Sequence, residues 1–361
     1  MSDQTLRGPE TVVRTPRKAA TGEAYLEVSD LRVQFPTADG TVDAVQGLSY
    51  SLPLGRTLAI VGESGSGKSV SSMAVLGLHD PRGTRITGSI KVGGKQVVGM
   101  SADELRRYRG ADAAMIFQDP QSSLHPYFTI GDQIMESYRA HHKVSKRVAK
   151  AQAIDMLGRV GIPNPQRRIS SYPHEFSGGM RQRAMIAMAL VNDPKLLIAD
   201  EPTTALDVTV QAQILDLIGD LQRDFGSAVV FITHDLGVVA EVADDVLVMY
   251  AGNAVEHGPV GKVLGAPLHP YTWGLLESLP ALSGEPAPLH PIPGSPPSLL
   301  AVPSGCPFHP RCEFRDRVGG EHCTTVHPGL VPRTADTGRL SRCHLKDPDR
   351  VYQIEILPRL P

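Results

Sequence analysis

Residues 62–69 read Gly-Glu-Ser-Gly-Ser-Gly-Lys-Ser, and they match the phosphate-binding pattern Gly-x4-Gly-Lys-Ser/Thr without a mismatch. An apolar run over 58–61 precedes them, and a helix is predicted from Ser69 to about Leu78. The three glycines let the backbone curl so that several N–H groups point inward, and the helix start adds its positive dipole end. The stretch therefore predicts a cradle for phosphate oxygens, in which Lys68 reaches the terminal phosphates and the Ser69 hydroxyl binds Mg²⁺. The alternative is an ordinary glycine-rich turn between a strand and a helix.

Length and composition restrict what kind of protein this is. The 361 residues suffice for one large or two modest domains, and 41% hydrophobic residues suit a globular core. A formal net charge of −2 gives no support to bulk binding of nucleic acid. No apolar run approaches the ~20 residues that cross a bilayer. The N-terminal residues 1–24 are polar, so we expect a disordered tail rather than a secretory signal, and any membrane role runs through a partner.

The pattern of apolar residues predicts an α/β fold. Residues 25–61 largely alternate between apolar and polar positions, which predicts antiparallel strands joined by a turn at 37–40. Continuous apolar runs at 196–199 and 229–232 are typical of strands buried on both faces of a parallel sheet. Shorter strand signals lie at 89–92 and 113–117, and helices are predicted over about 130–160 and 180–190.

Two carboxylates end the apolar run at 196–199. In open α/β sheets, ligands lie at the carboxyl ends of the strands. Asp200 is thus expected to hold Mg²⁺ and Glu201 to polarise a water for attack on the γ-phosphate. The alternative is that Asp200 caps a helix or turn and Glu201 is merely solvated.

A second candidate anion cradle precedes the helix predicted over 180–190. Ser177, Gly178 and Gly179 place a hydroxyl and two glycines at its start, although Ser-Gly-Gly is also an ordinary turn. Of the two cradles, only the first contains a lysine, Lys68, and the sequence offers one acidic strand end, Asp200-Glu201, to serve them. We therefore expect the second cradle to serve a nucleotide that another chain holds.

Together these stretches resemble the nucleotide-binding domain of ATP-binding cassette (ABC) proteins, with six motifs in the family's order. They are Gly62–Ser69 (Walker A), Gln118 (Q-loop), Phe176–Met180 (signature), Leu196–Glu201 (Walker B and catalytic glutamate), Ala205–Asp207 (D-loop) and His234 (switch histidine). Met180 departs from the glutamine that is usual in the family, which we expect to tune the signature rather than abolish it. The resemblance implies a P-loop NTPase fold with a parallel-sheet core, an antiparallel β subdomain and a helical subdomain.

The resemblance also implies roles for individual residues. Phe35 would stack on adenine, although a half-buried strand residue is the alternative for it. Catalysis would involve Glu201, His234 and Gln118, and Mg²⁺ would bind Ser69, Gln118 and Asp200. The residues implied to bind ATP are Phe35, Gly62, Ser64, Gly65, Gly67, Lys68 and Ser69, with Ser177, Gly178 and Gly179 serving the ATP of a partner. Two such domains would close head to tail on two ATP molecules, and hydrolysis would release them.

All four cysteines follow residue 305, at Cys306, Cys312, Cys323 and Cys343. Clustered thiols in a cytosolic protein indicate a metal or cluster site, although their spacing does not fit the paired cysteines of most zinc sites. The stretches 266–272 and 305–312 resemble the C-terminal region of ATPase subunits from dipeptide and oligopeptide importers. In some members of that group these cysteines hold a 4Fe–4S cluster, so a cluster is the expectation here. Zinc and plain thiols are the alternatives.

The resemblance implies an ATPase subunit of a bacterial peptide importer, with a tail over 1–24, an ABC domain over 25–265 and a cysteine module over 266–361. Such a subunit lies on the cytoplasmic face of the membrane. Its implied partners are two permeases, an extracytoplasmic substrate-binding protein and a second, similar ATPase, with no nucleic acid. Alternative cargoes are nickel and haem. Proteins of other classes, a soluble ABC ATPase in DNA repair or translation or an ABC exporter, are the remaining alternatives.

Overall fold

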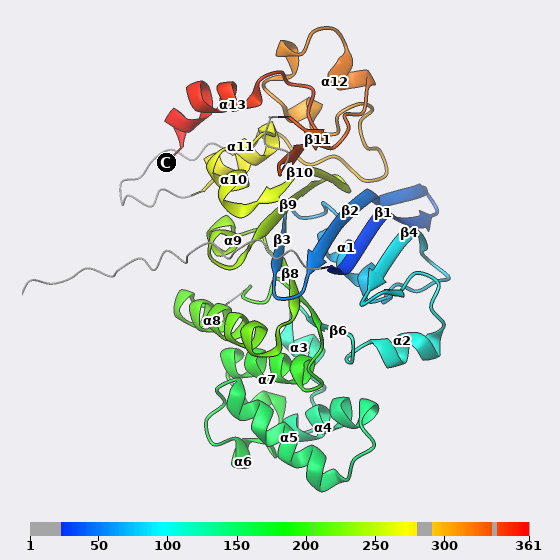
Figure 1. Ribbon diagram of the computed structural model, residues 1–361, viewed down its shortest axis with the longest axis vertical. Helices are drawn as coiled ribbons and strands as arrows, with labels where there is room; N and C mark the ends of the chain where they lie inside the picture. The colour runs from blue at the N-terminus through cyan, green and yellow to red at the C-terminus, as the bar shows by residue number, and fades with distance from the viewer. Residues whose placement is uncertain (1–22, 205, 280–290, 334–337, 361) are drawn as a thin grey trace, which may run out of the picture.

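The computed structural model describes residues 23–204, 206–279, 291–333 and 338–360 (Figure 1). Residues 1–22 of the tail predicted over 1–24, and Ala205 of the D-loop, lie outside the described residues; Ala24 already belongs to β1. The described fold includes a large sheet, a smaller antiparallel sheet beside β3 (Thr57–Val61) and α1 (Lys68–Val75), and a group of helices at the far end of the large sheet (Figure 1).

The large sheet has eight strands in the order β11-β12-β10-β9-β3-β8-β7-β6. Five neighbours, from β9 to β6, pair in parallel. The central strands β3, β7 and β8 are buried along their whole length, as their continuous apolar sequences predict. The bounds of these strands are β3 Thr57–Val61, β6 Ala113–Ile116, β7 Leu196–Asp200, β8 Ala228–Ile232, β9 Asp245–Tyr250 and β10 Asn253–Pro259. The predicted parallel α/β core is confirmed.

The antiparallel sheet has the strand order β2-β1-β4-β5. Its long hairpin turns between Thr37 and Gly40, where the sequence predicts it, and the Thr37 hydroxyl donates to the Gly40 carbonyl over 2.7 Å. The antiparallel prediction for 25–61 is wrong at its end, because β3 joins the parallel sheet instead; its residues are all apolar or buried and do not alternate. The strands are β1 Ala24–Thr37, β2 Gly40–Pro53, β4 Arg85–Val92 and β5 Lys95–Gln96.

A helical subdomain packs around α7, with a core that includes Ile134, Met156 and Met185. The single helical stretch predicted over 130–160 is two helices, because the chain leaves the helix at His142 and restarts at Ser145, whose hydroxyl caps the second one. The helices up to residue 242 are α1 Lys68–Val75, α2 Ala102–Tyr108, α3 Pro120–Ser123, α4 Ile130–His141, α5 Lys146–Arg159, α6 Pro165–Arg168, α7 Gly178–Leu190, α8 Val208–Phe225 and α9 Leu236–Val242.

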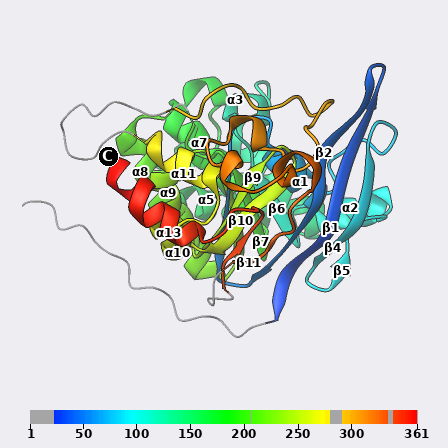
Figure 2. The same cartoon turned by 90° about the horizontal axis from the view of Figure 1, so that it is seen from above.

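The cysteine module lies over the β10 edge of the large sheet (Figure 2). It adds two short strands to that sheet, since β12 pairs with β10, so the sheet continues across the predicted boundary at residue 265. Trp273 of the module is buried and packs edge-to-face on Phe314. The remaining elements are α10 Val260–Gly265, α11 Pro270–Glu277, α12 His322–Thr325, β11 Val331–Pro332, β12 Leu340–Ser341 and α13 Pro348–Val351. Short 3-10 turns lie at Pro173–Glu175, His309–Arg311, Arg315–Arg317 and Leu357–Arg359, and a π-helical turn lies at Tyr352–Ile356. None of the described helices combines the length and the apolar character that a membrane span needs.

Candidate nucleotide site

The phosphate-binding loop connects the end of β3 to the start of α1, as the sequence predicts. Gly67 has φ +100°, in the left-handed region, and a Cβ on it would lie 2.4 Å from the Ala44 carbonyl oxygen. A larger residue therefore fails there both by conformation and by space. The glycine brings the loop against the neighbouring backbone and leaves the N–H groups at the start of α1 to face the cradle.

Lys68 is buried at the inner side of this loop. Its Nζ donates to the carbonyl oxygens of Gly62, over 2.7 Å, and Glu63, over 3.0 Å. Burial lowers the pKa of Lys68, while the charges of Glu201, Asp200 and Glu63 act in the opposite direction. An ammonium group held by two loop carbonyls can exchange them for phosphate oxygens without moving its stem far.

Ser69 and Asp200 meet across the sheet edge, because the serine hydroxyl donates to Asp200 Oδ1 over 3.1 Å. Burial raises the pKa of Asp200; the Ser69 hydrogen bond and the Lys68 charge oppose this, and the Glu201 charge adds to it. A hydroxyl and a carboxylate oxygen are ligands that Mg²⁺ takes in phosphate sites. The two residues therefore fit a magnesium ion.

Glu201 gathers three further side chains at the end of β7. Its Oε2 accepts hydrogen bonds of 2.9 Å from Gln118 Nε2 and from the Thr204 hydroxyl, and its Oε1 lies 3.4 Å from His234 Nδ1. Glu201 has φ +46°, an uncommon conformation for a non-glycine residue that occurs often in functional sites. The three predicted catalytic side chains thus lie together. Thr204 was not predicted, and only its position three residues after Glu201 would have indicated it.

The Ser-Gly-Gly cradle and Phe35 lie on other parts of the fold. Ser177 caps α7 in the helical subdomain, away from α1, and its hydroxyl accepts from the Met180 amide over 3.3 Å (Figure 1). Gly178 faces open space, whereas a Cβ on Gly179 would lie 3.1 Å from Val210. Phe35 is half-buried on β1, with its ring centroid 5.6 Å from that of His79.

The four cysteines line one small cavity in the cysteine module. Burial raises the pKa of Cys306 to about 11 and those of Cys312 and Cys343 to about 12, so without a metal these thiols are neutral at pH 7. The cavity has a volume of about 10 Å³, the space of about one water molecule.

These thiols do not fit a 4Fe–4S cluster in the arrangement described. Across the described ranges, no group of three or more His, Cys, Asp or Glu side chains is placed to hold a metal ion. The predicted cluster is not supported, because spacing along the chain did not specify how close the sulfur atoms come. The four cysteines form no disulfide bonds.

Comparison with known proteins identifies two family regions. A model described as "ABC transporter" matches residues 45–204, and one described as "Oligopeptide/dipeptide transporter, C-terminal region" matches residues 255–318. Among solved structures, an ATP-binding cassette dimer in a post-hydrolysis state with ADP and Pi has a TM-score of 0.59 at 24% identity, covering 65% of this chain and 98% of that one. At this identity the match shows the fold alone, and the fold agrees with the predicted ABC architecture.

Two curated relatives are much closer in sequence. The oligopeptide transport ATP-binding protein OppD of Salmonella typhimurium is 52% identical over 335 residues, 92% of this chain and 96% of that protein. The dipeptide transport ATP-binding protein DppD of Bacillus subtilis is 50% identical over 326 residues, 90% of this chain and 96% of that protein. The chain therefore belongs to the family of oligopeptide and dipeptide transport ATP-binding proteins, which are ABC ATPases.

Proposed function

We propose that this chain is the ATP-hydrolysing subunit of a peptide importer and that it works as one half of an ATPase dimer. The observation that carries the proposal is the hydrogen bond between Ser69 and Asp200 beside the buried Lys68 of the loop, in a chain of this family. The Ser177 cradle supports the dimer, because it stands on the helical subdomain and has no lysine or acidic strand end of its own. It is suited to the nucleotide of a second subunit.

In this proposal ATP binds the loop over 62–69 through the backbone N–H groups and Lys68, with Phe35 against the adenine. Ser69 and Asp200 hold the magnesium ion, with Gln118 beside it. When bound, Mg²⁺ neutralises charge that develops on the phosphates.

Glu201 acts as the group that accepts a proton from the attacking water. Its carboxylate has both oxygens engaged, by Gln118 and Thr204 on one side and His234 on the other. These contacts fix the direction in which the carboxylate faces. His234 has 65% of its side chain accessible, so it can reach the γ-phosphate when the dimer closes.

The proposed partners are two permeases, an extracytoplasmic substrate-binding protein and a second, similar ATPase, with the chain bound peripherally at the cytoplasmic face of the membrane. The relatives favour peptides over nickel or haem as cargo, because they are named for oligopeptide and dipeptide transport.

The test is reconstitution of the complex in vesicles with two candidate permeases and a candidate partner ATPase from the same organism. We expect co-purification with both permeases and ATP-dependent uptake of labelled di- and oligopeptides. Nickel and haem serve as control cargoes. Absence of any polytopic partner, or uptake of nickel or haem in place of peptides, would contradict the proposal.

A further inference from the structure

The phosphate-binding loop contains a carboxylate, Glu63, at its second position. A loop that cradles a triphosphate gains from positive charge, and a carboxylate in it opposes binding unless another group neutralises it. The Glu63 side chain is 28% exposed, and its carbonyl oxygen already accepts from Lys68. Something else in the molecule must compensate this charge.

Arg311 supplies that compensation from the cysteine module, 248 residues away along the chain. Its Nη1 lies 2.7 Å from Glu63 Oε2 and its Nη2 lies 3.1 Å from Oε1, so the two groups form a paired, bidentate contact. The arginine side chain is only 5% exposed. A pair of this kind is far less screened by salt than a surface ion pair.

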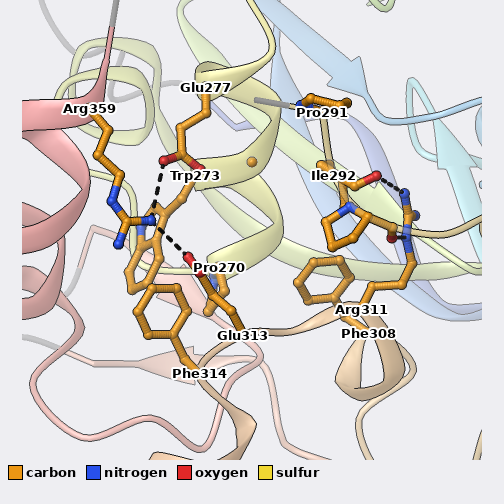
Figure 3. Close-up of a pocket in the computed structure, with 12 residues that line it drawn as sticks. Pro270, Trp273, Glu277, Pro291, Ile292, Phe308, Arg311, Glu313, Phe314 and Arg359 are labelled. Atoms are coloured by element: carbon orange, nitrogen blue, oxygen red, sulfur yellow. Dashed lines mark hydrogen bonds and ion pairs between the residues drawn. The ribbon is translucent and has the colours of Figure 1, made fainter. Parts of the chain in front are cut away.

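Contacts other than Glu63 also hold the guanidinium group of Arg311 in position. Arg311 Nε donates to the Pro293 carbonyl over 2.8 Å, and Nη2 lies 3.4 Å from the Gly294 carbonyl oxygen. Nη2 also lies 3.4 Å from the carbonyl oxygen of Ile292, whose position beside Arg311 is drawn in Figure 3. The Tyr250 ring lies beside it, with its centroid 5.8 Å from the arginine Cζ. Because backbone carbonyls hold the fork, its position depends on the fold of the module rather than on Glu63.

The cysteine module makes a second contact with Glu63, through Tyr271. The backbone N–H of Glu63 donates to the hydroxyl of Tyr271, a fully buried residue of α11, over 2.8 Å. Glu63 is thus bound at its side chain by Arg311 and at its backbone by Tyr271. Both residues that bind Glu63 stand next to residues that line the cysteine cavity: Tyr271 follows Pro270, and Arg311 precedes Cys312.

We propose that Arg311 is a positioning residue for the phosphate-binding loop: it neutralises and orients Glu63, so that the cysteine module sets the affinity of the loop for a triphosphate. This rests on the proposed function only in that the loop binds ATP. It assigns the module a direct role at the nucleotide, in addition to its packing against the sheet.

The test measures nucleotide binding by the full chain, with ATP and AMP titrated against the wild type, Arg311→Gln, Glu63→Gln and the double variant. Arg311→Gln leaves a carboxylate uncompensated, so we expect ATP affinity to fall about tenfold and AMP affinity to fall about threefold at most, since AMP carries less charge. Glu63→Gln should stay within about threefold of the wild type. The double variant should regain ATP affinity to that same level, because the repelling charge is gone.

The matched controls are Arg317→Gln and Glu355→Gln, which break another bidentate pair of the same module, with two contacts of 2.6 Å on the exposed surface. They should leave both affinities unchanged. If Arg311→Gln does not fold, Arg311→Lys keeps the charge without the fork and should lower ATP affinity about threefold, again with recovery in combination with Glu63→Gln. Unchanged ATP affinity in the Arg311 variants, or a double variant as weak as Arg311→Gln, would overturn the proposal.

Failure of this inference is distinguishable from failure of the importer proposal. Binding of ATP and AMP is measured on the single chain, without permeases or cargo. A chain that shows the expected cycle but transports no peptide would retain the role of Arg311 and lose the importer. A chain that transports peptides but lacks the expected changes in ATP affinity would support the importer proposal and leave Arg311 as a packing residue.

Discussion

The phosphate-binding loop and the cysteine module each contain a short, distinctive set of residues, but the two sets depend on structure in different ways. In the loop, eight consecutive residues build the cradle from their own backbone, and the partners of Lys68 lie five and six residues away. In the module, four cysteines spread from Cys306 to Cys343 depend on the tertiary fold for every distance between them. Local spacing determines a site when the backbone itself is the ligand. It does not determine one that side chains must assemble from separate segments.

The largest effect is expected when the lysine of the loop is removed, which tests whether the loop is the ATP site. Lys68→Ala loses the charge that the cradle presents to the terminal phosphates, so we expect ATP turnover and peptide uptake to fall about a thousandfold. ATPase assays on the reconstituted complex measure the change. Lys91→Ala, on the exposed face of β4, is the matched control and should behave as the wild type. Uptake that continues undiminished in Lys68→Ala would refute the assignment of the site.

Glu201→Gln separates binding from chemistry within the same site. The amide can still accept a hydrogen bond but cannot take a proton from water, so we expect turnover to fall about a hundredfold while ATP binding stays within about threefold of the wild type. Stopped ATP hydrolysis with retained nucleotide should also prolong the closed dimer, which size-exclusion chromatography with ATP detects. The control is Thr204→Val, which removes one hydrogen bond to the carboxylate and should cost far less. Equal losses of binding and turnover in Glu201→Gln would assign Glu201 to binding rather than proton transfer.

The loop and the strand that feeds it could be predicted closely, because glycine conformations and continuous apolar runs are local properties. The meeting of Ser69 with Asp200 followed from the rule that parallel strands present their carboxyl ends at one edge. The pairing of Glu63 with Arg311 could not be predicted, since neither residue carries a local pattern that indicates the other. The break between α4 and α5 was also missed, because Ser145 is a capping residue only once the chain is known to leave the helix at His142. The positions of the four sulfur atoms in the module likewise could not be predicted, because they depend on the tertiary fold.

Phe35 gives a smaller effect that tests the adenine side of the site. Phe35→Ala removes an aromatic ring of the kind that stacks on a base, so we expect ATP affinity to fall about fivefold. AMP affinity should fall by the same factor, because both nucleotides share the adenine. This equal loss contrasts with the selective loss of ATP binding expected for Arg311→Gln. Phe35→Trp keeps a stacking surface and should bind both nucleotides as the wild type does. A selective loss of ATP in Phe35→Ala would place the ring near the phosphates instead.

The smallest effect tests the cysteine module through the chemistry of its thiols. Burial raises the pKa of Cys306 to about 11 and of Cys312 and Cys343 to about 12. It also raises the pKa of Cys323, which, like Cys312, is only half-buried. The thiolate is the form that reacts, and below its pKa its fraction rises about tenfold per pH unit. We therefore expect iodoacetamide to modify Cys323 first at pH 7, about ten times faster at pH 8, with the other three protected until the chain unfolds. Peptide mass spectrometry measures each site, and iron and acid-labile sulfide are assayed on the same samples, since a bound cluster would protect all four cysteines and abolish the pH dependence. Protection of all four cysteines in protein that contains iron would mean that the sulfur atoms come closer together than the described cavity allows. The loop and the module would then both be ligand sites, and they would differ only in the ligand, a nucleotide in the loop and a cluster in the module.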